Sequence, residues 1–193
     1  REGLKRLLHT GHPGLRRLME VSGSGARTPS TFTLGFQLGP RINAGGRVGE
    51  ASAGLDLLLS RDPTETARLA RELDLQNRKR QELEAMVLEE AEAELGDTPD
   101  GLGLVAASDR WHPGVVGIVA ARLVRKYHRP SFVIALEEGG GKGSGRGLPG
   151  VSLMDALRAC SPCLKGFGGH DGAAGIVIEA DRVADFRKIL GAW

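Results

Sequence analysis

The sequence predicts an α/β protein: a small mixed-sheet domain with flanking helices, preceded by a long connector helix and the tail of an upstream domain. Two observations support this class. From residue 98 onward, short apolar runs of strand length alternate with helical segments. Before them, residues 63–95 form one helical stretch with clear start and stop signals. We therefore divide the chain into residues 1–61, which hold the tail and a motif loop, the connector 62–97 and the α/β domain 98–193.

The connector helix is defined by its ends. Asp62 is a capping residue, Pro63 suits the first helical position, and Glu65 follows the cap by three residues. Gly96 stands where a C-terminal cap is expected. Apolar residues gather towards both ends, whereas residues 76–82 are polar all round, which spoils a sustained heptad. This pattern favours a connector between two packed bodies over the alternative, a coiled-coil arm.

The elements on either side follow from local patterns. In the α/β domain we expect strands near 103–108, 131–136, 142–147 and 175–179, and helices near 115–126, 152–159 and 181–190. In the tail we expect two short basic helices interrupted by a glycine-proline turn.

Composition narrows the class of protein. The chain has 193 residues, 40% hydrophobic and 26% charged, which suits one or two globular units with a real core. A net charge of only +2 excludes a histone-like polycation but permits a local basic groove. Aromatic residues make up 4%, too few for an extensive base-stacking platform. Nucleic acid should therefore be held mainly through its backbone.

Location and redox state can also be inferred. The longest apolar runs fall far short of the ~20 residues that span a bilayer, and no signal peptide opens the chain, so we expect a cytoplasmic protein with no membrane partner. The chain starts at Arg1 within a basic helical stretch, and we expect a region upstream of it. Cys160 and Cys163 are too few for a disulfide framework or a structural zinc site. We expect both to be buried and reduced, and no metal site in this chain.

Two residue groups combine glycine with side chains that could bind a phosphate or another anion. Arg41, Asn43 and Arg47 stand in a glycine- and proline-rich stretch, and guanidinium forks bind phosphate oxygens in pairs. The alternative is a loop with two solvated arginines. His112 stands between a strand and the start of an apolar helix, where oriented N–H groups attract an anion. Many such turns hold no ligand.

Two further groups combine glycine with polar side chains. Glycine at every second position of 141–147 places Lys142, Ser144 and Arg146 on one face of an extended segment and leaves the other face bare for close backbone approach. A flexible loop is the alternative. Gly168 and Gly169 precede His170, an arrangement that permits a backbone nest for an oxyanion beside an imidazole. The alternative is a structural histidine.

These four groups, in this order and with the long helix between the first and second, resemble the C-terminal motifs of the RecJ exonucleases in the DHH phosphoesterase superfamily. Residues 39–47 are similar to G-P-R-x-N-A-x-G-R, and 112–117 to H-P-G-V-x-G. Residues 142–146 are similar to K-G-S-x-R, and 168–175 to the G-G-H-x-x-A-A-G signature of the DHH-associated domain. The resemblance covers nearly the whole chain.

The resemblance implies a 5′-to-3′ exonuclease that hydrolyses single-stranded DNA. It implies Mn²⁺ or Mg²⁺ held by an upstream DHH domain, whose Asp-His-His motif is absent here, so the expected partners are single-stranded DNA and that domain. Ser144 and Arg146 would grip a phosphate near the 5′ end, and His170 would reach the scissile phosphate as the catalytic residue. Asp171 and Gly172 depart from the small apolar pair common after this histidine. The substrate-binding residues expected are Arg41, Asn43 and Arg47, which would face the cleft, together with His112, Lys142, Ser144, Arg146, Gly168 and Gly169.

Two other functions fit parts of the pattern. An oligonucleotide or cyclic-dinucleotide phosphodiesterase of the same superfamily would share the Gly-Gly-His signature, but it should lack the connector helix and the motif at 39–47. A non-catalytic nucleic-acid-binding module is the other alternative, because a DHH-associated domain also occurs in alanyl-tRNA synthetases.

Overall fold

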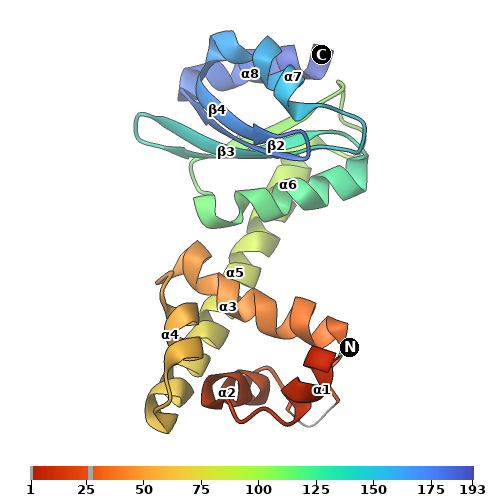
Figure 1. Cartoon of the computed structure of the whole chain (residues 1–193). Helices are drawn as coiled ribbons and strands as arrows, with labels where there is room; N and C mark the ends of the chain where they lie inside the picture. The colour runs from red at the N-terminus through yellow and green to blue at the C-terminus, as the bar shows by residue number, and fades with distance from the viewer. Residues whose placement is uncertain (1, 26–27) are drawn as a thin grey trace. The chain divides into compact units, whose positions relative to one another are not determined.

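A computed structural model describes residues 2–25 and 28–193. Contacts divide the chain into two compact units, Arg1–Glu82 and Leu83–Trp193. Helix α5 (Pro63–Leu95) is continuous, as the sequence predicts, and the boundary between the units falls within it (Figure 1). Among the described helices, none has the length and apolar character needed to cross a membrane.

The N-terminal unit is helical. Its core is formed by apolar side chains that include Leu18, Leu38, Leu57 and Leu73, each at most 2% exposed. Its elements are α1 (Glu2–Leu8), α2 (Pro13–Val21), the π-helix η1 (Thr33–Leu38), α3 (Gly39–Val48), α4 (Ala53–Leu59) and the first part of α5.

The prediction of a motif loop at residues 39–47 is wrong, because this stretch is helical and belongs to α3. Pro40 lies in the first turn, where it needs no N–H partner. Ala44 and Gly45 are buried, and a Cβ on Gly45 would meet the carbonyl oxygen of Glu50. Packing thus overrides the low helix propensity of the glycines.

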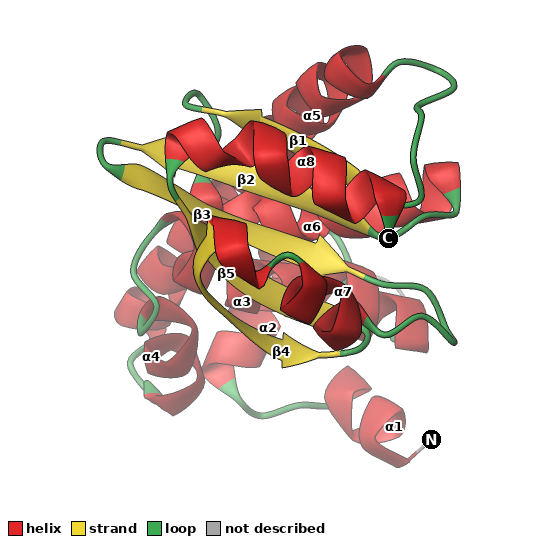
Figure 2. Cartoon of the chain, turned by 90° about the horizontal axis from the view of Figure 1, so that it is seen from above, coloured by secondary structure: helices red, strands yellow, loops and turns green. Residues whose placement is uncertain are grey.

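The C-terminal unit is a five-stranded mixed sheet with flanking helices, which confirms the fold class. The strand order is β1-β2-β3-β5-β4, and β1 and β2 are the parallel pair (Figure 2). The elements are β1 (Leu104–Ser108), α6 (Pro113–Tyr127), β2 (Ser131–Glu137), β3 (Gly140–Arg146), α7 (Leu153–Ala159), the 3₁₀-helix η2 (Ser161–Cys163), β4 (Leu164–His170), β5 (Ala173–Ile178), the 3₁₀-helix η3 (Ala180–Arg182) and α8 (Val183–Ala192).

Helices cover the two faces of this sheet unequally. Helices α7 and α8 lie on one face (Figure 1). On this face Phe132 and Phe186 meet edge to face with ring centroids 5.3 Å apart. Helix α6 and the last part of α5 lie on the other face, against Ala106, Val133 and Ala135. Helix α6 packs on β2 and β3, and on the same face Gly175 and Val177 of β5 and Gly168 and His170 of β4 are exposed.

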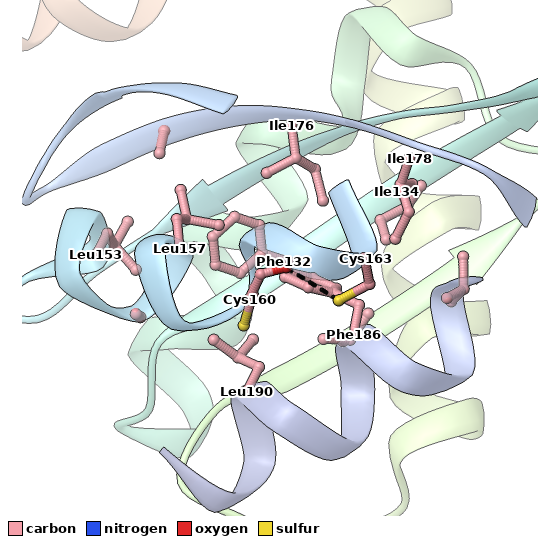
Figure 3. Packing of buried hydrophobic residues seen from close by; sticks show 14 residues of the cluster. Phe132, Ile134, Leu153, Leu157, Cys160, Cys163, Ile176, Ile178, Phe186 and Leu190 are labelled. Atoms are coloured by element: carbon pink, nitrogen blue, oxygen red, sulfur yellow. Dashed lines mark hydrogen bonds between the residues drawn. The ribbon is translucent and has the colours of Figure 1, made fainter. Parts of the chain in front are cut away.

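The two cysteines lie in the core under α7 and α8. Figure 3 shows Cys160 and Cys163 among Leu157, Phe186 and Leu190. Both are free and buried, as expected, and the Cys163 thiol donates to the Cys160 carbonyl oxygen at 3.0 Å. Burial raises the pKa of the Cys160 thiol to about 11 and also raises that of Cys163. Both thiols are therefore protonated at neutral pH.

The glycine face of β3 does not have the expected use. A Cβ on Gly143 would lie 2.7 Å from Ile176 Cγ1 and 2.9 Å from Ile134 Cγ1, and one on Gly145 would overlap the ring of Phe132. The face predicted to be bare for a ligand is therefore filled by the core. These glycines make room for neighbouring apolar side chains.

Candidate nucleic-acid interface

The exposed part of the sheet brings two of the sequence motifs side by side. Pairing aligns Ser144 with Gly175 and Gly175 with Gly168. Two residues further along β3, Arg146 pairs with Ala173, and Ala173 pairs with His170. Strands lie about 4.8 Å apart, so Arg146 and His170 stand about 10 Å apart across β5. We call the surface formed by Lys142, Ser144, Arg146, Gly168, His170, Ala173, Gly175 and Val177 the open face.

Ser144 and Arg146 form a linked pair on β3. Both are half-buried, and Arg146 Nη1 donates to Ser144 Oγ at 2.8 Å and to the Gly145 carbonyl oxygen at 2.8 Å. They point to the same face because they are two residues apart in a strand. These bonds give the guanidinium a defined orientation beside a hydroxyl, a combination suited to a phosphate oxygen.

His170 ends β4 and is exposed. The Gly172 N–H donates to its Nδ1 at 3.2 Å. In the neutral imidazole this bond leaves the proton on Nε2, which can then donate to an anion. The ring is thus oriented by the turn that joins β4 to β5.

The Asp171 carboxylate is bound to Ser152, and none of the described hydrogen bonds joins it to the His170 ring. Its Oδ1 accepts from the Ser152 hydroxyl at 2.6 Å. Ser152 caps α7, and its Oγ also accepts from the Asp155 N–H at 3.2 Å. The residue that departs from the family pattern therefore fixes the β4–β5 turn to the start of a helix.

The two glycines before His170 have different reasons to be glycine. Gly168 is exposed, and a Cβ there would have nothing within 4 Å. Gly169 has φ +145°, and a Cβ would lie 2.6 Å from Ala174 Cα. Gly169 is needed by the backbone, whereas Gly168 leaves space on the open face. Gly175, which ends the 168–175 signature but was not expected among the substrate-binding residues, is also exposed.

The remaining residues of the open face lie towards the ends of β3 and β5 opposite Arg146 and Ala173. Lys142 is exposed and pairs in register with Val177, which is 44% exposed. The open face thus carries two cationic side chains on β3, an imidazole at its end, and small residues between them. Such a surface is polar at its margin and lets a chain of atoms approach the backbone of β4 and β5.

His112 has a structural role that the sequence did not predict. It caps α6, with Nδ1 accepting from the Gly114 N–H at 3.0 Å. His12, in the other His-Pro-Gly tripeptide, caps α2 in the same way, accepting from the Leu15 N–H at 3.4 Å. The tripeptide is therefore a helix start in both places. Whether His112 also contacts a substrate stays a prediction.

The motif in α3 is divided between two sides of the helix. Arg41 Nε donates to Asp74 Oδ1 at 2.8 Å, with the two side chains 16% and 9% exposed, and Arg41 Nη1 donates to the Gln37 carbonyl oxygen at 2.7 Å. Asn43 and Arg47 are exposed and, four residues apart, share the other side. Arg41 is therefore held by an ion pair, whereas Asn43 and Arg47 are exposed, and the expectation that all three face a substrate cleft stays a prediction.

Asp74 was missed by the sequence analysis. It lies in the part of α5 whose neighbours Ala70, Leu73 and Asn77 are buried, and it also accepts from Arg78 at 2.9 Å. An acid among buried positions of a helix signals a basic partner, because a buried charge needs compensation. The position of Asp74 among apolar residues at helical spacing was therefore a signal that the sequence already carried.

The described residues contain no group of three or more histidine, cysteine, aspartate or glutamate side chains that could hold a metal ion. The residues of the open face include no carboxylate, and the charged side chains of Lys142 and Arg146 are donors, which suit anions rather than cations. The described residues of this face therefore do not fit a divalent metal.

Comparisons with known proteins agree with the motifs. Residues 101–193 match the DHHA1 domain family. The single-stranded-DNA-specific exonuclease RecJ of Bacillus subtilis is 40% identical over 191 residues, which cover 97% of this chain and 24% of that protein. The enzyme of the same name from Escherichia coli K12 is 40% identical over 190 residues, which cover 93% of this chain and 33% of that protein.

Solved structures give the same result. The crystal structure of RecJ in complex with Mn²⁺ from Thermus thermophilus matches with a TM-score of 0.86 and 35% identity, covering 98% of this chain and 28% of that one. The crystal structure of exonuclease RecJ bound to manganese matches with a TM-score of 0.85 and 35% identity, covering 98% of this chain and 47% of that one. The chain spans about a quarter to a third of the length of the curated relatives it matches. Residues 101–193 are thus a DHHA1 domain, and nearly the whole chain is homologous to one segment of the RecJ single-stranded-DNA-specific exonucleases.

Proposed function

We propose that this chain supplies the DNA-holding part of a single-strand-specific 5′-to-3′ exonuclease, and that an upstream DHH domain supplies the metal ions for phosphodiester hydrolysis. The observation that supports this proposal most is the register that aligns Arg146, Ala173 and His170, with Ser144 beside them. This places a guanidinium, a hydroxyl and an imidazole around an exposed strip of glycine and alanine. The relatives' activity on single-stranded DNA supports the choice of substrate.

The chemistry of the open face favours backbone recognition. Arg146 and Ser144 would bind the oxygens of a phosphate near the 5′ end, and Gly168 and Gly175 would let the sugar-phosphate chain lie close to the sheet. The described residues of this face include no phenylalanine, tyrosine or tryptophan to form a stacking platform for bases. Binding should therefore weaken as salt rises and depend little on base sequence.

This binding proposal is tested by titrating a fluorescent 12-nucleotide single strand at several salt concentrations, with and without a 5′ phosphate. We expect tighter binding of the phosphorylated strand, and we expect Ser144→Ala with Arg146→Ala to abolish the preference. Arg16→Ala, outside the motifs, is the matched control. A titration that is selective for sequence and insensitive to salt would contradict the proposal.

The metal-dependent step is assigned to the upstream domain because the residues present do not fit a divalent ion. We expect the chain alone to have no nuclease activity, since hydrolysis by this class of enzyme needs a metal-activated water. Purified chain is assayed with Mn²⁺ and single-stranded DNA, and the same chain joined to its upstream domain is the positive control. Robust degradation by the chain alone would sink this part of the proposal.

His170 is the residue we assign to the reacting phosphate. Its Nε2–H would donate to phosphoryl oxygens as charge grows on them during in-line attack. In the complete enzyme, His170→Ala should lower the single-turnover rate at saturating DNA by about a hundred-fold. DNA affinity, measured separately, should change much less. Lost affinity with normal cleavage would make His170 a binding residue only.

A further inference from the structure

We propose that Gly117 of helix α6 is a positioning residue: its missing side chain leaves the space in which Ser144 and Arg146 are held ready for a phosphate. The phosphate-binding role of these two side chains rests on the proposed function. The effect of Gly117 on their positions does not, and it can be measured by itself.

The observation is a close approach between a helix and two functional side chains. A Cβ on Gly117 would lie 2.9 Å from Ser144 Oγ, 2.9 Å from Arg146 Nη2 and 3.4 Å from Ser144 Cβ. Carbon atoms do not approach nitrogen and oxygen atoms this closely without displacement of one partner. The space beside Gly117 is therefore occupied by both members of the hydrogen-bonded pair, and no side chain fits there without moving them.

The backbone of α6, as the structure describes it, does not itself require glycine at this position. Gly117 lies within a regular helix that runs from Pro113 to Tyr127, and its φ lies outside the left-handed range. Alanine is the better helix former, so glycine here weakens the helix. Its neighbours Val116, Val119 and Ala120 are buried with ordinary side chains. What distinguishes Gly117 is the pair of groups opposite it.

The consequence depends on which atoms can move. Arg146 Nη2 is the far end of a flexible side chain, and Ser144 Oγ can turn about χ1. An added methyl group should therefore push the guanidinium and the hydroxyl out of their bonded arrangement rather than unfold the sheet. Affinity for a phosphate should fall while the fold persists, a split that a purely structural glycine would not produce.

The test compares Gly117→Ala with a matched change. Gly191→Ala also replaces a helical glycine, but its Cβ would meet only ordinary contacts at 3.8 and 3.9 Å. We expect G117A to bind a 5′-phosphorylated 12-nucleotide single strand about ten-fold more weakly than wild type without a lower unfolding temperature, and G191A to bind normally. In a background carrying S144A and R146A, G117A should cause no further loss.

A second readout does not depend on DNA. The NMR signal of the Arg146 Nε–Hε group, assigned by its loss in R146A, should shift in G117A and stay unchanged in G191A. If G117A does lower the unfolding temperature, the triple variant with S144A and R146A should recover it, because both contacted groups are gone.

The outcomes separate this inference from the proposed function. An unchanged Arg146 signal, normal binding by a G117A protein whose wild type prefers the 5′ phosphate, or a stability loss that the triple variant does not recover would each overturn the role of Gly117. A shifted signal in a protein whose wild type shows no preference for the phosphate would support the positioning role and reject the proposed phosphate site.

Discussion

Glycine has opposite roles on the two faces of the C-terminal sheet. Under α7 and α8, Gly143 and Gly145 are packed against Phe132, Ile134 and Ile176, and no space remains for a methyl group. On the open face, Gly168 and Gly175 are exposed and have no atom close enough to obstruct one. Glycine is therefore a packing residue on one face and a means of access on the other. Only the face, set by strand register, tells the two apart.

We call the face of the sheet under α7 and α8 the closed face. The largest effect on the free energy of unfolding should come from adding a methyl group there. Gly145→Ala places a methyl group in the ring of Phe132, and overpacking of this kind should lower the free energy of unfolding by about 3 kcal/mol. Gly168→Ala makes the same chemical change on the open face and should stay within about 0.5 kcal/mol. Urea denaturation of both variants measures the difference. Equal losses would mean that the two faces are not distinct.

Helix α3 shows the same contrast on a smaller scale, between a buried and an exposed side. Arg41→Ala removes one of two partners of the nearly buried Asp74, leaving the exposed Arg78, and should cost about 2 kcal/mol of unfolding free energy. Asn43→Ala, on the exposed side, should cost less than about 0.5 kcal/mol. Thermal and urea unfolding check the pair. A silent Arg41 change would show that its ion pair does not stabilise the fold.

A bulky residue on the open face should impair binding and spare the fold. Gly175→Val adds a branched side chain between Ser144 and Gly168, where we propose the sugar-phosphate chain lies. DNA affinity should fall about ten-fold, about 1.4 kcal/mol, with little change in unfolding free energy. The control is Gly3→Val, the same change at an exposed glycine outside the motifs where an added Cβ would have nothing within 4 Å. Normal binding by Gly175→Val would place the DNA elsewhere.

Local signals in the sequence were enough for elements whose start, stop and apolar period agree. Helix α5 is found with its predicted ends, because Asp62, Pro63 and Gly96 each mark a boundary. The buried state of Cys160 and Cys163 was also predicted. Strand β4 was not, because its glycines give no apolar alternation and its pairing with β5 is set by the hairpin.

Site residues were identified by type, but their geometry was not available from spacing. The sequence placed Ser144 and Arg146 on one face, and the structure agrees. It could not show that a side chain at Gly117 would collide with them or that Asp74 pairs with Arg41, because both relations join elements far apart in the chain. The sequence also could not show whether the glycine face of β3 is open or covered, because that depends on which elements pack against it.

The last expected effect is a pH dependence of stability, which should come from the thiols buried under α7 and α8. Burial, with a smaller contribution from Cys163, raises the pKa of Cys160 from 9.0 to about 11, so the folded protein resists ionisation that the unfolded chain permits. The unfolded state then binds fewer protons between these values, and stability should be constant below pH 9 and decline from pH 9 towards 11. Urea midpoints across this range measure the decline, and Cys160→Ala, which removes the thiol, should reduce it. Alkylation by iodoacetamide at about pH 8 should be slow in the native chain and fast in urea, because the thiolate is the reacting form. Fast native alkylation, or the same pH slope in Cys160→Ala, would mean that α7 and α8 do not seal their face of the sheet.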